Sequence, residues 1–306
     1  MEIMEKINIV FSSDNNYAQY LGVTICSIFE NSKNKDKIDI YVLDGGILKE
    51  NKDKLKIIES KYNFIITYIE IDTSLFKDFY ISGYLTQATY YRIMIPDLLP
   101  NLKKVLYLDC DIIVKGDISE LYNKNIDNYF FAAVEDEGFI SKFFSKLEIA
   151  KNEKYFNAGV MLINVEKWRE TNINKTIINF INEKREQLES HDQDAINSIL
   201  YGKWLNLPYK YNVTTTIPDN HQINDDVLIV HYTGPKPWNY LCLHPFKNEY
   251  FKYLKKTPWN ESKKYKDKNI KNIIIKFSEQ MIYFIFPKNI INIIKKIKRK
   301  IGIKFY

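Results

Sequence analysis

Cysteine is scarce in this chain. Its 306 residues include three cysteines, Cys26, Cys110 and Cys242, which are far apart in sequence and form no CxxC pair. Domains held together by disulfides, and metal sites built from paired cysteines, use more cysteine at closer spacing. We therefore expect reduced thiols and a cytoplasmic protein.

Long apolar runs are also missing. No stretch approaches the roughly 18 consecutive apolar residues that a membrane-spanning helix requires. The first residues, MEIMEKINIVFSSD, mix acidic and basic side chains and pass directly into a strand pattern, so we expect no signal peptide. The chain has no internal repeat either. These absences argue against an integral membrane protein or a repeat architecture and predict a soluble or peripheral protein.

The charge that is present is unevenly distributed. The formal net charge is +6, but residues 263–306 contain 13 Lys and Arg against 2 Asp and Glu. This segment alone carries +11, so residues 1–262 carry −5. A mildly acidic body is followed by a strongly basic end.

Short β-branched runs alternate with longer helical patterns over the first two thirds of the chain. The runs predict strands at residues 7–11, 38–43, 64–71, 105–108, 129–134, 160–165 and 227–232. Helical spacing predicts helices at residues 17–32, 47–62, 174–187 and 191–200. This order predicts an α/β fold with a Rossmann-like, mostly parallel central sheet flanked by helices. We expect residues 1–245 to form this domain and residues 246–306 to form a basic, aromatic, helical C-terminal segment.

Polar residues follow several of the predicted strands. Ligands of parallel sheets bind beyond the carboxyl ends of the strands, so these residues are candidates for a binding site. They are Ser12, Asp14 and Asn16 after the first strand, Asp44 after the second, Asp109 and Asp111 after the fourth, and His231 at the end of the last. We expect two carboxylates and an imidazole to converge on one edge of the sheet.

Asp109 and Asp111 are the best candidates for a metal site. In extended chain, residues i and i+2 lie on one side about 7 Å apart, so both carboxylates can address one cation. Oxygen ligands suit Mg²⁺ or Mn²⁺, and adding the His231 imidazole favours Mn²⁺. A second pair, Asp192 and Asp194, lies in a helical pattern, where the carboxylates diverge by about 200° and cannot share an ion. The alternative for the first pair is a solvated turn.

Five segments, in this order, resemble glycosyltransferase family 8, whose members are retaining enzymes of the GT-A fold. The segments are residues 8–28 (NIVFSSDNNYAQYLGVTICSI), 89–122 (TYYRIMIPDLLPNLKKVLYLDCDIIVKGDISELY), 155–169 (YFNAGVMLINVEKWR), 191–200 (HDQDAINSIL) and 231–238 (HYTGPKPW). The family includes bacterial lipopolysaccharide galactosyl- and glucosyltransferases and glycogenin. The resemblance covers the predicted catalytic domain and fades beyond residue 245.

The resemblance implies a set of site residues. Asp109, Asp111 and His231 match the manganese ligands of the family, with diphosphate oxygens of a UDP-sugar completing the coordination. Ser12, Asp14, Asn16 and Tyr17 match the uridine-contacting loop, Gly234 and Lys236 resemble the diphosphate contacts, and Arg92, Asp136, Asn157, Asp192 and Gln193 match positions around the donor sugar. This chain departs from the family in one respect, since only Pro235 separates the glycine from Lys-Pro-Trp, where two residues are common.

The resemblance also implies an activity. We expect transfer of glucose or galactose from UDP-glucose or UDP-galactose to a glycan, with retention of configuration. A divalent ion, Mn²⁺ or alternatively Mg²⁺, would neutralise the leaving diphosphate. Arg92, Asp192 and Gln193 are the expected catalytic residues. The alternatives are a catalytically weak UDP-sugar-binding protein and a nucleotide-sugar hydrolase on the same fold.

The basic end of the chain predicts membrane contact. From Ile290, isoleucines recur at helical spacing with lysines and an arginine interleaved, and aromatic residues precede them. A helix of this kind suits an anionic membrane surface, so residues 270–306 would hold the protein at the inner face of the cell membrane. The alternative is a helix that packs on the domain. No base-reading module accompanies the lysines, so we expect no nucleic-acid partner.

The acceptor is expected to be a cell-surface or lipid-linked glycan. We expect its contacts around residues 210–225, in the stretch YNVTTTIPDNHQINDD (211–226), where the sequence has no readable pattern.

Overall fold

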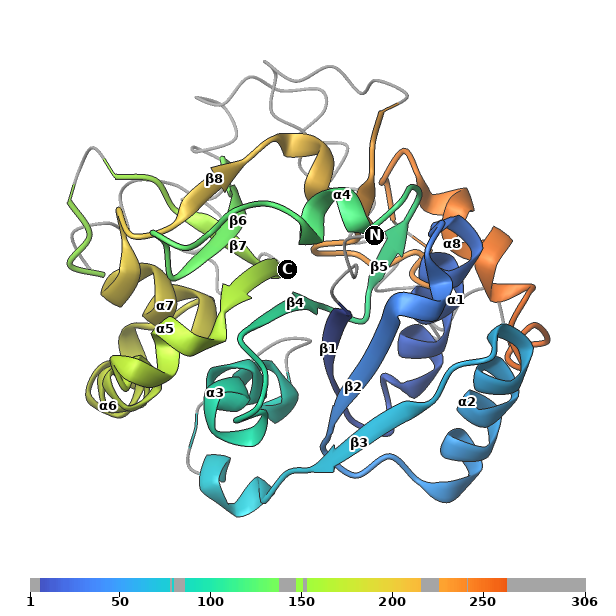
Figure 1. The fold of residues 1–306 in the computed structure, drawn as a ribbon, viewed down its shortest axis with the longest axis horizontal. Helices are drawn as coiled ribbons and strands as arrows, with labels where there is room; N and C mark the ends of the chain where they lie inside the picture. The colour runs from blue at the N-terminus through green and yellow to red at the C-terminus, as the bar shows by residue number, and fades with distance from the viewer. Residues whose placement is uncertain are drawn as a thin grey trace, which may run out of the picture.

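A seven-stranded sheet forms the centre of the chain (Figure 1). The computed structural model describes residues 6–77, 79, 86–137, 147–150, 153–215, 226–240 and 242–262. The sheet has the strand order β3-β2-β1-β4-β7-β6-β8, and β7 is antiparallel to both of its neighbours while the other pairs are parallel. Its strands are β1 (Ile7–Ser13), β2 (Ile38–Asp44), β3 (Ile66–Glu70), β4 (Lys104–Leu108), β6 (Phe131–Glu135), β7 (Phe156–Asn164) and β8 (Leu205–Leu207). The predicted α/β fold with a mostly parallel central sheet is confirmed.

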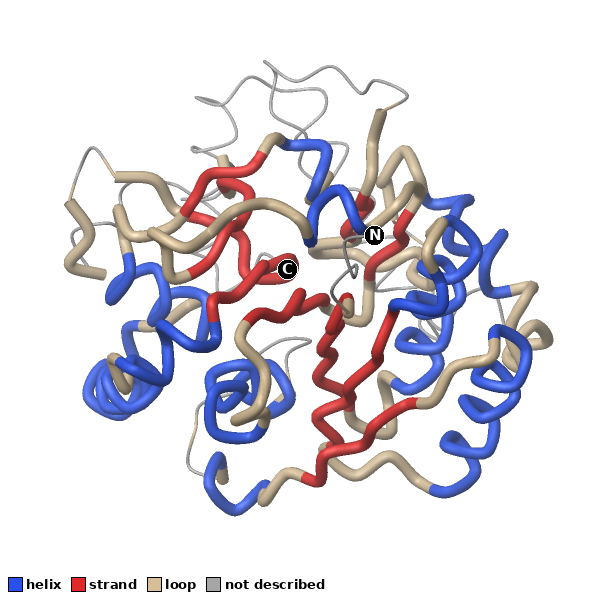
Figure 2. Tube along the Cα trace, in the orientation of Figure 1, coloured by secondary structure: helices blue, strands red, loops and turns tan. Residues whose placement is uncertain are grey.

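Helices cover both faces of this sheet (Figures 1 and 2). One face packs against α1 (Ala18–Asn31), α2 (Lys49–Tyr62) and α8 (Lys247–Leu254). The other packs against α3 (Ile95–Leu98), α5 (Val165–Glu170), α6 (Ile173–Lys184) and α7 (Asp192–Leu200). The short helices are α4 (Ser119–Tyr122) and the 3₁₀ helices η1 (Lys35–Lys37), η2 (Thr73–Phe76), η3 (Gln87–Met94), η5 (Arg185–Gln187) and η6 (Tyr209–Tyr211).

Alternate residues of the central strands feed two separate cores. In β4, Leu106 and Leu108 pack with α1, whereas Val105 and Tyr107 pack on the opposite face. This follows from the period of two along a strand. Because both faces are buried, such a strand has an almost continuous hydrophobic sequence, which is why it is recognisable without a structure.

The chain that contains the two aspartates connects two sheets. The sequence LYLDCDIIV is not one strand: β4 ends at Leu108, and β5 (Ile112–Val114) then pairs with β9 (Ile229–His231) in a separate two-stranded antiparallel sheet. Residues 109–111 therefore form the link between the sheets. Sequence analysis missed β5 and β8, which have three residues each, and predicted one helix over 174–187 where the structure has α6 followed by η5.

Packing continues across residue 245. Tyr250, Tyr253 and Leu254 of α8 are buried in the same core as α1, together with Trp259. Gly22 of α1 makes this contact feasible, since a Cβ at this position would lie 2.5 Å from the Trp259 ring. The contacts thus extend this core to Trp259, and the division into two segments at residue 245 stays a prediction.

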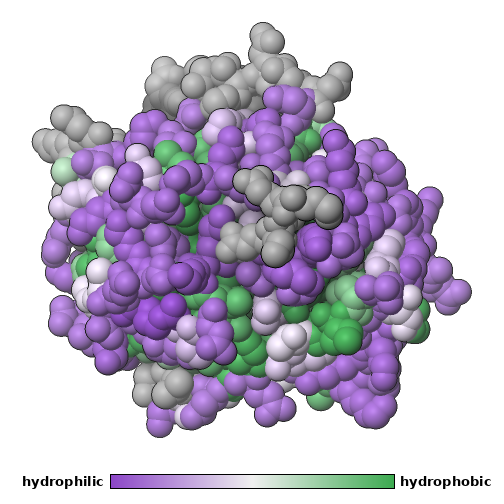
Figure 3. All heavy atoms as spheres, in the orientation of Figure 1, coloured by the Kyte–Doolittle hydropathy of each residue, from purple (hydrophilic) through white to green (hydrophobic). Residues whose placement is uncertain are grey.

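The surface gives little sign of an apolar partner on the face shown in Figure 3, where hydrophilic residues predominate and hydrophobic ones form small groups. Within the described ranges, no helix is long and apolar enough to span a bilayer. The predicted helical segment over residues 270–306 lies outside the described residues.

The buried side chain of His244 forms hydrogen bonds with two backbone segments, at residues 213 and 246. It is 2% exposed, its Nδ1 accepts a hydrogen bond from the Phe246 amide at 3.2 Å, and its Nε2 lies 3.3 Å from the Val213 carbonyl oxygen. Burial lowers the pKa of His244 from 6.5 to about 4. The folded protein therefore binds fewer protons at this residue than the unfolded chain does between these two pH values.

Acidification should accordingly destabilise the fold through His244. Because the folded pKa is the lower one, the stabilisation is complete above pH 6.5 and is lost as the pH falls toward 4. We expect His244 to contribute about 2 kcal/mol to the loss of unfolding free energy between pH 7 and pH 5. Urea unfolding at both pH values should show a smaller loss for His244→Gln than for the wild type. An equal loss in both proteins would contradict the assignment.

Candidate active site

A cleft opens where the strand order changes direction. β1 has β2 on one side and β4 on the other, and a ligand crevice is expected at the carboxyl ends of two such strands. The cleft has a volume of about 370 Å³. The predicted site residues that line it are Ser12, Tyr17, Arg92, Asp109, Asp111, Asp136, Asn157, Asp192, Gln193, His231, Gly234 and Lys236.

Three residues that were expected at this edge are not among those that line the cleft. The Asp14 carboxylate accepts hydrogen bonds from the backbone amides of Asn16 and Tyr17 at 2.9 and 3.0 Å, so it shapes the turn that starts α1. The Asn16 side chain is exposed. Asp44 accepts hydrogen bonds from the amides of the turn after β2, and Lys52 lies 2.6 Å away. Both carboxylates thus accept Asx-type hydrogen bonds from nearby backbone amides.

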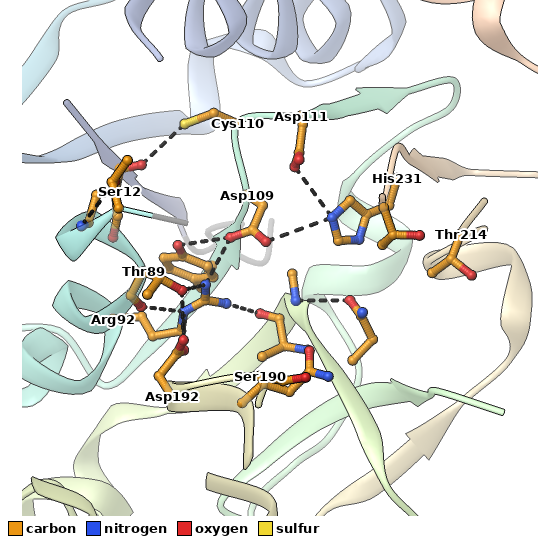
Figure 4. A pocket seen from close by; sticks show the side chains of 18 of the residues that line it. Ser12, Thr89, Arg92, Asp109, Cys110, Asp111, Ser190, Asp192, Thr214 and His231 are labelled. Atoms are coloured by element: carbon orange, nitrogen blue, oxygen red, sulfur yellow. Dashed lines mark hydrogen bonds and ion pairs between the residues drawn. The ribbon is translucent and has the colours of Figure 1, made fainter. Parts of the chain in front are cut away.

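Asp109, Asp111 and His231 converge in the cleft (Figure 4). One ligand atom from each lies within 4.8 Å of the other two. His231 Nε2 is 3.3 Å from Asp111 Oδ1 and 3.7 Å from Asp109 Oδ2. The two aspartates come from the link between β4 and β5, and the pairing of β5 with β9 brings His231 beside them. Two carboxylates and one imidazole form a donor set for a hard or borderline divalent cation.

Gly159 of β7 lies directly beneath this cluster. A Cβ on Gly159 would be 2.2 Å from His231 Cε1 and 2.8 Å from Asp109 Oδ2, closer than atoms can approach. The Asp109 amide also donates a hydrogen bond to the Gly159 carbonyl at 2.9 Å. The residue must therefore lack a side chain for the three ligands to converge. A glycine inside a strand pattern signals such close approach, and sequence analysis passed over it.

Lys236 pairs with the same cluster. Its ammonium group contacts Asp111 Oδ2 and donates a hydrogen bond to the Tyr232 carbonyl at 2.8 Å. Burial alone raises the pKa of Asp111, but the charge of Lys236 holds this pKa well below its usual range. Asp111 is therefore ionised at neutral pH. Gly234 has φ +68 and open space around it, a backbone conformation that favours glycine.

Arg92 is a buried cation shared by two carboxylates (Figure 4). It is 4% exposed, its NH2 lies 3.2 Å from Asp109 Oδ1, and its Nε lies 2.9 Å from Asp192 Oδ2. Its NH1 donates to the Ala158 carbonyl, and the guanidinium stacks on Tyr107 at 4.4 Å from the ring centroid. Burial by itself lowers the pKa of Arg92, but the two carboxylates raise it, so the side chain stays charged.

Asp192 opens α7 and points toward Arg92. Its Oδ1 accepts a hydrogen bond from the Thr89 hydroxyl at 2.6 Å. Burial raises the pKa of Asp192 to about 6, against the lowering effect of Arg92. Asp194 faces the other way: its carboxylate accepts hydrogen bonds from Tyr155 and from the amides of residues 189 and 190. The predicted divergence of Asp192 and Asp194 is confirmed.

Gln193 connects α7 to β7 through both ends of its amide. Oε1 accepts a hydrogen bond from the Ala158 amide at 2.9 Å, and Nε2 donates to the Tyr155 hydroxyl at 3.2 Å and to Asp136 at 3.5 Å. Since Ala158 N–H can only donate, the oxygen of Gln193 must face it. Asn157 donates to Asp136 at 3.3 Å from the same strand. These contacts bring Asp136, Asn157 and Gln193 together at the end of the cleft that also holds Asp192.

Sequence analysis missed four residues that shape this site. Thr89 and Tyr107 lie inside the matched segment 89–122, and Gly159 lies inside the matched segment 155–169. Asn212 follows η6, is completely buried, and contacts His231 through Asn212 Oδ1 and His231 Nδ1 at 3.0 Å. No pattern in the surrounding sequence indicates a role for Asn212.

The chain is similar to known glycosyltransferases over most of its length. The sequence pattern of glycosyltransferase family 8 matches residues 8–242. General stress protein A of Bacillus subtilis is 39% identical over 274 residues, which cover 84% of this chain and 96% of that protein. The lipopolysaccharide 1,2-glucosyltransferase of Escherichia coli K12 is 29% identical, over 84% of this chain and 80% of that enzyme.

Solved structures agree with the sequence comparisons. The crystal structure of the galactosyltransferase LgtC in complex with donor and acceptor sugar analogues superposes with a TM-score of 0.73 at 26% identity, over 82% of this chain and 96% of that one. The fold is that of the GT-A glycosyltransferases. With its matched segments gathered around one cleft, this chain belongs to glycosyltransferase family 8.

Proposed function

We propose that this protein is a retaining hexosyltransferase that transfers glucose or galactose from a UDP-sugar to a glycan. The observation that carries the proposal is that one cleft joins a cation-binding cluster, Asp109, Asp111 and His231, to the buried pair of Arg92 and Asp192. The first group suits a diphosphate and the second suits the hydroxyls of a sugar. The named activities of the E. coli glucosyltransferase and of LgtC support a hexose as the transferred group.

Asp109, Asp111 and His231 would hold the divalent cation. Their donor set of two carboxylates and one imidazole favours Mn²⁺ over Mg²⁺, which prefers oxygen ligands alone. The bare Cα of Gly159 supports this assignment, because the cluster occupies the space that a side chain would fill. When bound, the cation would act as a Lewis acid toward the diphosphate oxygens.

The remaining residues of the chain would bind and orient the donor. Lys236 would address the diphosphate with its ammonium group, which already lies beside Asp111. Ser12 and Tyr17 would contact the uridine, with Asp14 holding the turn that positions Tyr17. Burial raises the pKa of the Tyr17 hydroxyl far above its ordinary value, so the side chain would be neutral where it contacts the uracil ring.

At the sugar end, Asp192 would accept hydrogen bonds from donor hydroxyls. With a pKa of about 6 it is mostly ionised at neutral pH, and Arg92 balances its charge. Gln193 and Asn157 would face the sugar with Asp136, and Gln193 is held on both sides by Ala158 and Tyr155. A fixed amide can favour one sugar geometry without reorganising.

The acceptor is proposed to be a cell-surface or lipid-linked glycan, in line with the lipopolysaccharide named for the E. coli relative. Of the predicted acceptor region at 210–225, residues 210–215 are described, and Thr214 lines the cleft beside His231 (Figure 4). Residues 216–225 lie outside the described part of the chain.

Replacement of Asp111 tests the proposed donor chemistry. Asp111→Asn removes one anionic ligand and the partner of Lys236, so Mn²⁺-dependent release of UDP from UDP-glucose or UDP-galactose should fall about 100-fold or more. Asp117→Asn is the matched control, because Asp117 caps the chain before α4, 3.2 Å from the Ser119 amide, and does not line the cleft. Release with a glycan but not with water would separate transfer from hydrolysis. No Mn²⁺-dependent release by the wild type would sink the proposal.

Adding a methyl group to Gly159 tests the cation site separately. Gly159→Ala should push His231 away from the aspartates, weaken Mn²⁺ binding by about 10-fold or more, and cost about 1–3 kcal/mol of stability. In the control Gly116→Ala the nearest atom, Leu228 Cδ1, would be at 3.5 Å, an ordinary contact. Calorimetric titration with Mn²⁺ in the presence of UDP compares the two. Unchanged affinity in Gly159→Ala would exclude this position for the ion.

We also propose that residues 270–306 bind an anionic membrane at the cytoplasmic face. Each basic residue near such a surface contributes about 1 kcal/mol of attraction. The full chain should sediment with phosphatidylserine vesicles at physiological salt, whereas a chain truncated after Lys263 should remain in the supernatant. Neutral vesicles provide the control. Equal sedimentation of both chains would remove the membrane assignment and leave the enzymatic one untouched.

A further inference from the structure

We propose that Asn212 is a positioning residue that determines which nitrogen of His231 faces the cation site. The inference rests on the proposed function, in that His231 is taken to be a ligand of the cation. Asn212 fixes the imidazole proton on Nδ1 and leaves the lone pair of Nε2 directed at the two aspartates. Metal-binding histidines generally need such a partner on the other ring nitrogen.

Backbone pairing places Asn212 beside His231. The Val213 amide donates to the Ile229 carbonyl and the His231 amide donates to the Val213 carbonyl, both at 2.9 Å. Residues 212–213 thus run next to β9, and the Asn212 side chain is completely buried there. An uncompensated amide in this position would be costly, so its hydrogen bonds are strongly determined.

One backbone amide determines the direction of each hydrogen bond between Gly159 and His231. The Gly159 N–H can only donate, and it points at Asn157 Oδ1 at 3.1 Å, so the oxygen of Asn157 is identified. The same oxygen lies 2.9 Å from the Asn212 side chain, which must therefore present its nitrogen. Asn212 Oδ1 then faces His231 Nδ1 at 3.0 Å, and since this oxygen only accepts, Nδ1 carries the proton.

The consequence lies on the other side of the ring. With the proton on Nδ1, the neutral imidazole presents a lone pair at Nε2, 3.3 Å from Asp111 Oδ1 and 3.7 Å from Asp109 Oδ2. All three groups then offer lone pairs to one cation. The opposite tautomer would instead direct a proton at the cation site.

The same hydrogen bonds link the cation end of the cleft to the sugar end. Asn157, which orients Asn212, also donates to Asp136 at 3.3 Å, and Gln193 donates to the same carboxylate. A rotated Asn157 amide would therefore disturb both His231 and Asp136. Asn212 contacts only the first of these groups, so its replacement should affect cation binding more than donor-sugar contacts.

His244 provides an internal contrast. Its Nδ1 accepts from the Phe246 amide at 3.2 Å, which requires the proton on Nε2, where the Val213 carbonyl lies 3.3 Å away. Two buried histidines of one protein are thus assigned opposite tautomers by the same reasoning. A single measurement can test both.

The first experiment reads the tautomers directly. Wild-type protein with ¹⁵N-labelled histidine rings is studied in EDTA at pH 8.5 by two-bond ¹H–¹⁵N correlation, with His231→Gln and His244→Gln assigning the signals. We expect an Nδ1–H signature for His231 and an Nε2–H signature for His244. In Asn212→Leu, which has similar volume but no acceptor, the His231 signature should shift toward the other tautomer. A wild-type His231 with its proton on Nε2 would overturn the proposal.

The second experiment measures Mn²⁺ affinity by electron paramagnetic resonance of the free ion at constant UDP. Asn212→Leu should weaken binding about 10- to 100-fold, and Asn212→Asp, which keeps an acceptor for Nδ1–H but loses the donor to Asn157 Oδ1, should bind Mn²⁺ more tightly than Asn212→Leu. The control is Asn174→Ala. Asn174 of α6 is another buried amide, and it donates a hydrogen bond to Asp97 of α3 at 2.6 Å, so its replacement should leave the Mn²⁺ affinity unchanged. Wild-type affinity in Asn212→Leu would refute the proposal.

The two measurements remain informative in every case. If Asn212→Leu does not fold, the wild-type tautomer and Asn212→Asp still decide the question. The tautomer is measured without nucleotide or metal, so it stands or falls independently of sugar transfer. If the wild type has the assigned His231 tautomer but releases no UDP, the proposed function is refuted and the assignment of the tautomer is not.

Discussion

The arrangement of the cleft depends on the cost of holding negative charge away from water. Asp109, Asp111 and Asp192 lie close together, and the last two are almost fully buried. Unpaired carboxylates in such a place would be strongly destabilising, so cations must accompany them. Arg92 forms ion pairs with Asp109 and Asp192 from within the core, and Lys236 forms an ion pair with Asp111 from a loop. Arg92 is anchored by stacking and by a backbone carbonyl, whereas Lys236 reaches the cluster from a loop in which Gly234 has φ +68.

Strand β7 aligns the two ends of the cleft with each other. Three successive residues of this strand contact the cleft in turn. Residue 157 contacts Asp136 at one end, residue 158 contacts Arg92 and Gln193 in the middle, and residue 159 lies against the His231 cluster at the other end. Because β7 is antiparallel to β4, Gly159 lies opposite Asp109, the first aspartate after that strand. A single rigid strand therefore sets the distance between the proposed diphosphate and sugar positions. Sites built on strands in this way hold their geometry more tightly than sites built on loops alone.

Much of the fold and most of the cleft could be predicted from the sequence, for identifiable physical reasons. Strands such as β1 and β4 are buried on both faces, so their continuous apolar runs are visible, and the polar residues that follow them had to lie at one edge. Short strands such as β5 carry too few residues for a period to emerge. Asp14 and Asp44 were expected in the cleft because each follows a strand. In the structure their carboxylates accept hydrogen bonds from local backbone amides, and position after a strand does not indicate such bonds. Asn212 depends on pairing between segments about 20 residues apart, and such a contact leaves no trace in local sequence.

The seating of Trp259 against Gly22 has a consequence for how the molecule is made. The hydrophobic layer on that face combines residues from the first helix with a tryptophan more than two hundred positions later, so it cannot close until nearly all of the described chain has been synthesised. Before then, α1 exposes a shallow apolar surface to whatever surrounds the nascent polypeptide. Folds that depend on contacts of such long sequence separation assemble slowly. During synthesis, the segment that follows the cleft is thus the last part of this face to become available.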